Sequence, residues 1–133
     1  MALVVLDASV VIAFLDPDDA LHGAAVVALT EHQHDELVIP ASVYAEILVA
    51  PYRSGVDAVA EVEAFLSDFA VRTEGITAEV ARGAARLRSG SRSLRLPDAL
   101  VLATADEMEA ESVLTGDESW AAISPRVTLV RAR

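Results

Sequence analysis

Short apolar runs alternate along the chain with longer stretches in which apolar residues recur every three to four positions. The recurring pattern is typical of helices that bury one face, and the short runs have the length of buried strands. This alternation predicts an α/β fold with a mainly parallel central sheet of about four to five strands. Right-handed crossovers place helices on both faces of such a sheet. The expected strands lie at residues 2–6, 37–39, 112–115 and 127–130.

Capping residues, proline and glycine mark where the predicted helices begin and end. We expect Thr77 and Asp98 to cap the starts of two helices, and Pro51 and Gly55 to break or kink a third. Gly and Pro are few, 6 and 5, and no linker or repeat interrupts the chain. A single domain over residues 1–133 is therefore predicted. The expected helices lie after Ser9, at 20–33, 43–50, 57–70 and 78–89, and after residue 98.

The composition excludes several classes of chemistry. The chain of 133 residues has no Cys, and its 10 basic residues are all Arg. It therefore lacks a thiol nucleophile, a thiolate metal site, a P-loop lysine and a Schiff-base lysine. The first residues lack the basic region of a signal peptide, and no run reaches the ~18–20 uncharged residues of a spanning helix. We expect a soluble cytoplasmic protein without a membrane partner.

Four acidic residues stand in apolar or structurally constrained surroundings. Asp7 and Asp117 come directly after predicted strands, Glu46 lies inside a mostly apolar helix, and Asp98 stands at the start of another. Functional groups in open α/β sheets gather beyond the carboxyl ends of the strands. Converging carboxylates repel one another, and burying them is costly unless they are paired or bound to a metal. A hard cation such as Mg²⁺ or Mn²⁺ resolves that conflict.

Each of these acids also has a plainer interpretation when it is taken alone. Asp7 and Asp98 could serve only as helix N-caps, Glu46 could face solvent, and Asp117 could be a turn residue. The joint pattern favours a shared site, because two of the acids end strands and two start or line helices around the same sheet edge.

Four segments carry a family resemblance. They are Leu6-Asp7-Ala-Ser9, Ala45-Glu46-Ile-Leu, Leu96-Pro97-Asp98-Ala-Leu-Val-Leu-Ala-Thr-Ala and Leu114-Thr115-Gly-Asp117-Glu-Ser-Trp120. In order and spacing, over essentially the whole chain, they resemble PIN-domain ribonucleases, and more specifically the VapC-type toxins of bacterial type II toxin–antitoxin systems. The third segment is the most specific. Many relatives carry a further acid where this chain has Ser119, which makes a second metal less secure than a first.

The resemblance implies a metal-dependent endoribonuclease. Its four acids fall on Asp7, Glu46, Asp98 and Asp117, which would hold Mg²⁺ or Mn²⁺ for attack by water on a phosphodiester bond. The family's hydroxyl near the metal falls on Ser9 and its late Thr on Thr115, and both would support the ligands by hydrogen bonds.

The same resemblance implies partners and a substrate class. The substrate would be a structured cellular RNA, with tRNA first and ribosomal RNA next. A cognate VapB-type antitoxin would bind the protein, which would also form a homodimer and a toxin–antitoxin hetero-oligomer. The alternative is a catalytically inactive PIN-fold domain that serves only in protein interactions.

The net charge of −11 argues at first against a nucleic-acid partner. The distribution changes that view: the first 75 residues hold 13 acids and 2 Arg, whereas the rest hold 8 of each. Half of the arginines fall in residues 82–95, a segment without acids just before Asp98. They either form a solvated helix face that pairs with the acidic half or guide RNA phosphates, which guanidinium groups bind in a bidentate way. The arginines expected to bind RNA are Arg86, Arg92 and Arg95.

Overall fold

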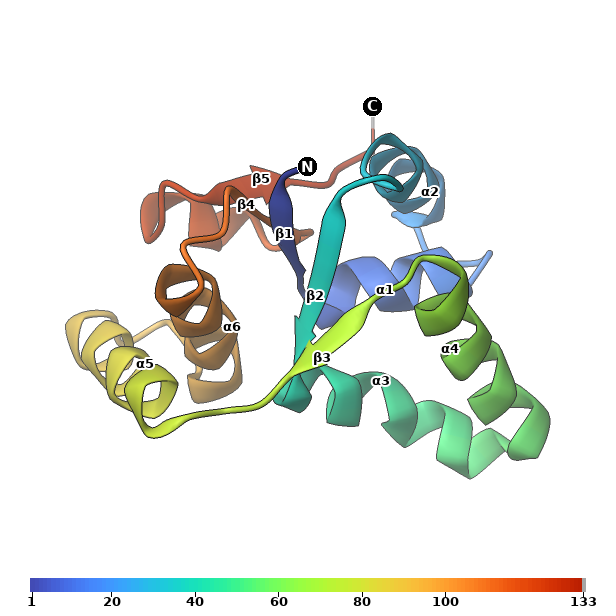
Figure 1. Ribbon diagram of the computed structural model, residues 1–133, viewed down its shortest axis with the longest axis horizontal. Helices are drawn as coiled ribbons and strands as arrows, with labels where there is room; N and C mark the ends of the chain where they lie inside the picture. Colours follow the sequence, from blue (N-terminus) through green and yellow to red (C-terminus); the bar gives the residue numbers. More distant parts are fainter. Residues whose placement is uncertain (133) are drawn as a thin grey trace.

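The five strands of the sheet are all parallel and stand in the order β3-β2-β1-β4-β5 (Figure 1). This computed structural model describes residues 1–132. The predicted α/β fold with a mainly parallel sheet is thereby confirmed. In the register of the two central strands, Leu6 stands opposite Leu114. The strands are β1 (Leu3–Leu6), β2 (Glu36–Pro40), β3 (Arg72–Glu74), β4 (Ser112–Thr115) and β5 (Val127–Leu129).

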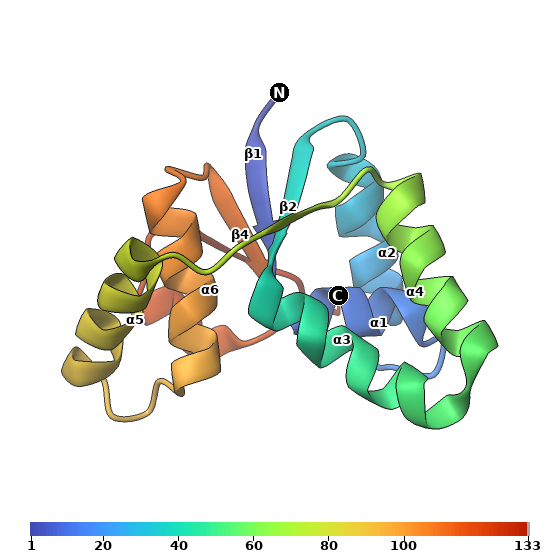
Figure 2. The same cartoon turned by 60° about the horizontal axis from the view of Figure 1, so that its bottom comes forward.

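The helices form one layer on each face of the sheet (Figures 1 and 2). The chain steps from β1 to β2 to β3 in one direction and returns to β4 in the other. Right-handed crossovers that step in opposite directions lie on opposite faces. Helices α1 to α4 therefore cover one face, and α5 and α6 cover the other. The helices are α1 (Ala8–Leu15), α2 (His22–Glu31), α3 (Ala41–Ser54), α4 (Val56–Asp68), α5 (Ala78–Gly90) and α6 (Leu96–Glu107).

The core lies between these layers and explains the apolar strand sequences. Val4, Val5 and Leu6 of β1 are fully buried, because helices cover the sheet on both sides. On the α1–α4 side, the rings of Phe14, Phe65 and Phe69 form one cluster with centroids 5.1–5.3 Å apart. None of the helices in residues 1–132 is both long and apolar enough to cross a membrane.

Helix α6 is the most deeply buried helix, and its small side chains let α5 approach closely. A Cβ on Gly83 of α5 would lie only 3.3 Å from the Cβ of Ala103. Ala99, Leu102 and Ala105 are completely buried. Because α6 contacts β1, β2 and β4, its first turn is held firmly over the carboxyl edge of the sheet.

Two of the expected helix ends differ from those in the structure. The start of α6 was expected at Asp98, but the helix begins at Leu96 with Arg95 as N-cap, and Asp98 lies in its first turn. Pro97 is tolerated there because the first turn needs no N–H donor from it. Helix α3 was expected to end near residue 50 but continues through Pro51 to Ser54, and Gly55, with φ of 131°, ends it.

Other local predictions are confirmed, and two short elements were not anticipated. The side chains of Asp7 and Thr77 accept backbone hydrogen bonds as the N-caps of α1 and α5. Strand β3 is a three-residue polar edge strand, and the 3₁₀ helix η1 (Glu118–Ala122) is a single turn. Elements this short carry no recognisable apolar period.

Candidate active site

The candidate site lies where the carboxyl ends of β1 and β4 meet. The chain leaving β1 steps toward β2, whereas the chain leaving β4 steps the opposite way toward β5. Such a switch point opens a crevice at the carboxyl edge, where open α/β sheets place their functional groups. Asp7 follows β1, Thr115 ends β4, and Asp117 comes two residues later.

Asp7 is the buried centre of the site, with only 7% of its surface exposed. Its Oδ1 accepts the N–H of Ala8 at 2.8 Å. Its Oδ2 accepts two hydroxyl groups, those of Ser9 and Thr115, each at 2.8 Å. Burial raises the pKa of Asp7, and the hydrogen bonds from both hydroxyls oppose that rise. The N-cap role of Asp7 is real, but it uses only one of the two carboxyl oxygens.

The same hydroxyl groups fasten the loop after β4 to the start of α1. Ser9 Oγ accepts the N–H of Gly116 at 3.0 Å, and Thr115 Oγ1 accepts the N–H of Asp117 at 3.1 Å. A Cβ on Gly116 would lie 2.6 Å from Cδ1 of Leu21. A side chain at residue 116 would therefore require the end of the Leu21 side chain to move.

Asp117 is held by the turn that follows it. Its Oδ1 accepts both the backbone N–H of Ser119, at 3.0 Å, and the Ser119 hydroxyl, at 2.6 Å. Asp117 is the N-cap of η1, and the buried Trp120 anchors that helix in the core. Asp117 is therefore a turn residue, as its plainer interpretation predicted, and it also lies beside Asp7.

Asp98 reaches the site from the first turn of α6. Burial raises its pKa, the negative charge of Asp7 adds to the rise, Arg95 opposes it, and Asp117 adds further. The N-terminus of a helix is also favourable for a carboxylate. These influences place Asp98 within electrostatic range of Asp7, Asp117 and Arg95.

Glu46 projects toward the same acids from α3. Its side chain is largely exposed, but partial burial of its carboxyl raises the pKa, and Asp7 and Asp98 raise it further. Arg95 again opposes the rise. A glutamate that merely faced solvent would not be influenced by two acids from other elements. The structure therefore brings all four predicted acids into one neighbourhood.

The donor chemistry of this neighbourhood fits a hard divalent cation. Every candidate ligand is a carboxylate oxygen, the type that Mg²⁺ and Mn²⁺ prefer, and the mutual repulsion of the acids favours an added positive charge. Within residues 1–132, no three acidic or histidine side chains already stand close enough to share one ion. Binding would therefore require small side-chain movements or water molecules between some carboxylates and the ion.

The predicted arginines divide into two groups. Arg95 is the N-cap of α6 and lies in electrostatic range of Glu46 and Asp98, and Arg92 stands in the exposed loop just before it. Arg86 instead lines a groove between α5 and α6 with Asp106 and Glu107, near the other end of α6. In the described chain, none of the three forms an ion pair.

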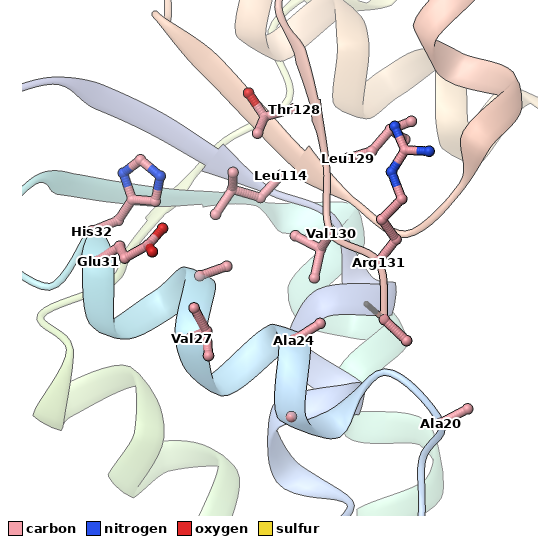
Figure 3. A pocket seen from close by; sticks show the side chains of 13 residues that line it. Ala20, Ala24, Val27, Glu31, His32, Leu114, Thr128, Leu129, Val130 and Arg131 are labelled. Atoms are coloured by element: carbon pink, nitrogen blue, oxygen red, sulfur yellow. The ribbon is translucent and has the colours of Figure 1, made fainter.

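A separate hollow lies between α2 and the segment that includes β5 (Figure 3). Its lining includes Ala24, Val27 and Val130, with His32 and Arg131 at its margins. None of the four acids lines it. The candidate acids are therefore gathered at the strand ends and not in this mostly apolar hollow.

Comparisons with known proteins agree with this arrangement. A toxin–antitoxin complex from Klebsiella pneumoniae is 22% identical, with a TM-score of 0.80 over 96% of this chain and 98% of that one. VapC20 of Mycobacterium tuberculosis, a sarcin–ricin loop cleaving toxin, is 24% identical, with a TM-score of 0.71 over 91% and 96%. VapBC2 of Rickettsia felis, bound to a promoter DNA fragment, is 16% identical, with a TM-score of 0.77 over 96% of each chain.

These likenesses establish a shared fold at low sequence identity. None of the curated proteins compared with the chain is a significant match. The PIN domain family, by contrast, matches residues 4–124, a span that contains most of β1, all of β4 and all four acids. With its strand order, its switch-point acids and this match over most of its length, the chain belongs to the PIN domain family.

Proposed function

We propose that the protein is a Mg²⁺- or Mn²⁺-dependent endoribonuclease that acts as the toxin of a toxin–antitoxin pair. It would hydrolyse phosphodiester bonds in a structured cellular RNA, with tRNA as the expected substrate, in the cytoplasm. The observation that carries the proposal is the convergence of four carboxyl groups at the switch point, where Asp98 and Glu46 have pKa values raised by burial and by Asp7. The whole chain, residues 1–133, would be the functional unit.

Each acid has a role that follows from its surroundings. Asp7, Asp98 and Asp117 would hold the cation, and the bound cation supplies stabilisation of the charge that develops on the scissile phosphate. Asp7 is kept in place by Ser9 and Thr115. Glu46, whose side chain is exposed, would bind through water or orient the attacking water by accepting its hydrogen bond.

Arginines beside the acids would bind the RNA backbone. Arg92 and Arg95 are exposed and make no ion pair with a carboxylate in residues 1–132, so their guanidinium groups are available to phosphates. Arg86 would contribute at a greater distance, from the groove between α5 and α6. The arginines beside the acids would give a phosphodiester chain a positively charged path past Asp98.

Protein partners are proposed from the surface and from the similar structures. Several of those are complexes of a toxin with an antitoxin. The acidic excess of the first 75 residues suits a basic VapB-type antitoxin. Three apolar side chains around the turn from α3 to α4 are exposed: Val49 by 50%, Tyr52 by 70% and Val56 by 80%. Such a patch supports a homodimer or a toxin–antitoxin hetero-oligomer.

The test is expression of the wild type and of Asp98→Asn, followed by sequencing of new RNA ends. The wild type should arrest growth and produce discrete ends, and the variant should do neither. The identity of the ends then separates tRNA from ribosomal RNA. Ends shared by both proteins would show that the assigned site is wrong. Tight antitoxin binding without cleavage under any divalent cation would instead support a non-catalytic interaction domain.

A further inference from the structure

The hydroxyl of Ser42, in the first turn of α3, is buried and has no hydrogen-bond partner within residues 1–132. The indole N–H of Trp120 is the other such group among the described residues. A buried polar group without a partner destabilises the folded state, so each instance in a protein calls for an explanation. The Ser42 hydroxyl therefore either carries an uncompensated cost or gains a partner in another state of the protein.

The usual partner of a hydroxyl in a helix is not available to Ser42. Thr30 and Thr104 each donate to the carbonyl four residues earlier in their own helices, at 2.7 Å. The residue four positions before Ser42 is Val38, which belongs to β2 and not to a helix. Ser42 does not cap α3 either, because the N-cap is Pro40 and no side chain caps that helix end. A partner for this hydroxyl must therefore come from another side chain or from a ligand.

Glu46 lies one helical turn after Ser42 in α3. Residues four apart stand on the same face of a helix, and the Cα–Cβ bonds of a helix tilt toward its N-terminus. The stem of Glu46 is thereby placed on the Ser42 side of its own turn. In the described chain, no donor hydrogen-bonds to the Glu46 carboxylate. A donor without an acceptor and an acceptor without a donor therefore stand one turn apart on one helix face.

Hydroxyl groups already hold two of the other acids in the same way. They are those of Ser9 and Thr115 on Asp7 and that of Ser119 on Asp117. Glu46 is exposed and has no such support. Ser42 is the hydroxyl that its position in α3 makes available to Glu46.

We propose, on the basis of the function proposed above, that Ser42 is a positioning residue for Glu46. When Glu46 turns inward toward a bound divalent cation, the Ser42 hydroxyl donates a hydrogen bond to one of its carboxylate oxygens. The other oxygen is then held in a fixed direction toward the cation or its water. In the metal-free protein the hydroxyl stays unpaired, so this hydrogen bond belongs to the loaded state alone.

Ser42→Ala tests the inference, because it removes the hydroxyl and keeps the rest of the helix. The matched control is Ser54→Ala, at an exposed serine at the other end of α3. Thermal unfolding in a chelator should show that Ser42→Ala is at least as stable as the wild type, since no hydrogen bond is lost. Calorimetric titration should show that Ser42→Ala binds Mn²⁺ about tenfold more weakly. Ser54→Ala should bind Mn²⁺ like the wild type.

Three further measurements separate positioning from a merely structural role. Ser42→Thr keeps the hydroxyl and should keep the affinity for Mn²⁺. In a Glu46→Ala background, loss of the Ser42 hydroxyl should have no further effect on that affinity. With RNA as substrate, kcat of Ser42→Ala should fall while KM stays unchanged, because the buried hydroxyl does not contact RNA.

An unchanged Mn²⁺ affinity of Ser42→Ala would overturn the inference, and so would a tenfold loss that persists in the Glu46→Ala background. A Tm of Ser42→Ala below that of the wild type in chelator would also overturn it, because the hydroxyl would then have a partner in the empty site. No Mn²⁺ binding by the wild type would instead overturn the proposed metal-dependent function.

Discussion

The hydroxyl of Thr115 donates a 2.8 Å hydrogen bond to Oδ2 of Asp7, a residue 108 positions earlier in the chain. Both side chains are buried, at 0% and 7% exposure. The same hydroxyl accepts the N–H of Asp117. One oxygen atom therefore joins the ends of the two central strands and fixes the turn that carries the last acid.

Replacing Thr115 by Val should destabilise the protein by about 1–3 kcal/mol, because the shape is kept while the buried carboxylate of Asp7 loses one of its donors and the N–H of Asp117 loses its acceptor. Thr115→Ser retains the hydroxyl and should keep the hydrogen bonds at the cost of one methyl group. Urea denaturation of the two variants measures the difference. Equal stability of Thr115→Val and the wild type would show that the hydroxyl link contributes nothing to folding.

Gly116→Ala should destabilise the protein by about 1 kcal/mol, because the added Cβ would lie 2.6 Å from Cδ1 of Leu21 and the end of that side chain would have to move. Residue 116 does not have a positive φ, so the cost is one of space and not of backbone strain. Leu21→Ala removes the obstacle and should reduce the cost of the second substitution. A double-mutant cycle measures this coupling, and strictly additive free energies would contradict it.

The crowded carboxylates should make the metal-free protein less stable at neutral pH. Burial and Asp7 raise the folded-state pKa of Asp98 above 3.8 and, with Asp98, that of Glu46 above 4.5. A carboxyl with a raised pKa adds stability fully below its unfolded-state pKa, and this stability is lost as the pH rises through the folded-state pKa.

Asp98→Asn should therefore raise Tm at pH 7 in the presence of a chelator, and the gain should shrink as the pH falls toward 3.8. Differences in Tm between the variant and the wild type at each pH separate this effect from general acid denaturation. Asp57→Asn, at an exposed position in the first turn of α4, is the control. A gain that grows as the pH falls would contradict the direction of the pKa shift.

Addition of Mg²⁺ or Mn²⁺ should reverse the order of stabilities. Binding to the folded state alone stabilises it by about 2.7 kcal/mol at a free concentration of one hundred times Kd. The wild type should gain most of this stabilisation. Asp98→Asn should gain little, because it lacks one of the carboxylates proposed to bind the cation. Thermal unfolding with and without the ion measures the effect. An equal rise in Tm for both proteins would place the cation elsewhere.

Loss of Arg92 and Arg95 should weaken RNA binding and flatten its dependence on salt. Two phosphate contacts to single-stranded RNA account for a change of about 1.4 in the slope of log K against log salt. The measurement is made in the Asp98→Asn background, so that the RNA stays intact. Arg53→Ala, an exposed arginine near the end of α3, is the matched control. An unchanged slope in the double variant would remove these arginines from the interface.

The strands and helices could largely be predicted because their apolar periods are local properties of the chain. The identity of the acids was also accessible, since each stands next to a strand or helix signal. The resemblance implied that Thr115 and Ser9 support the acids by hydrogen bonds, and both hydroxyls do bond to Asp7. Residue patterns alone could not pair Thr115 with Asp7, because a pairing over such a distance depends on strand order. Gly116 is likewise evident in the sequence, but its close approach to Leu21 depends on how α1 and α2 pack against β4.

The start of α6 shows a different limit of sequence reasoning. Asp is a common N-cap, and Pro commonly precedes a helix, so Asp98 was expected to begin it. Proline is equally compatible with the first helical turn, and local sequence does not distinguish the two cases. The structure places Arg95 at the cap. From this first-turn position Asp98 lies in electrostatic range of Asp7 and Asp117, with the Arg95 guanidinium beside it.

The link between Asp7 and the loop after Thr115 also has a consequence for synthesis on the ribosome. Asp7 is translated before its hydroxyl partner Thr115 and before Asp117, which come more than a hundred residues later. A nascent chain that stops short of β4 lacks the pairing of β1 with β4 and lacks Asp117. The cell that makes this protein is thus exposed to an assembled site only after almost the entire PIN domain has been translated.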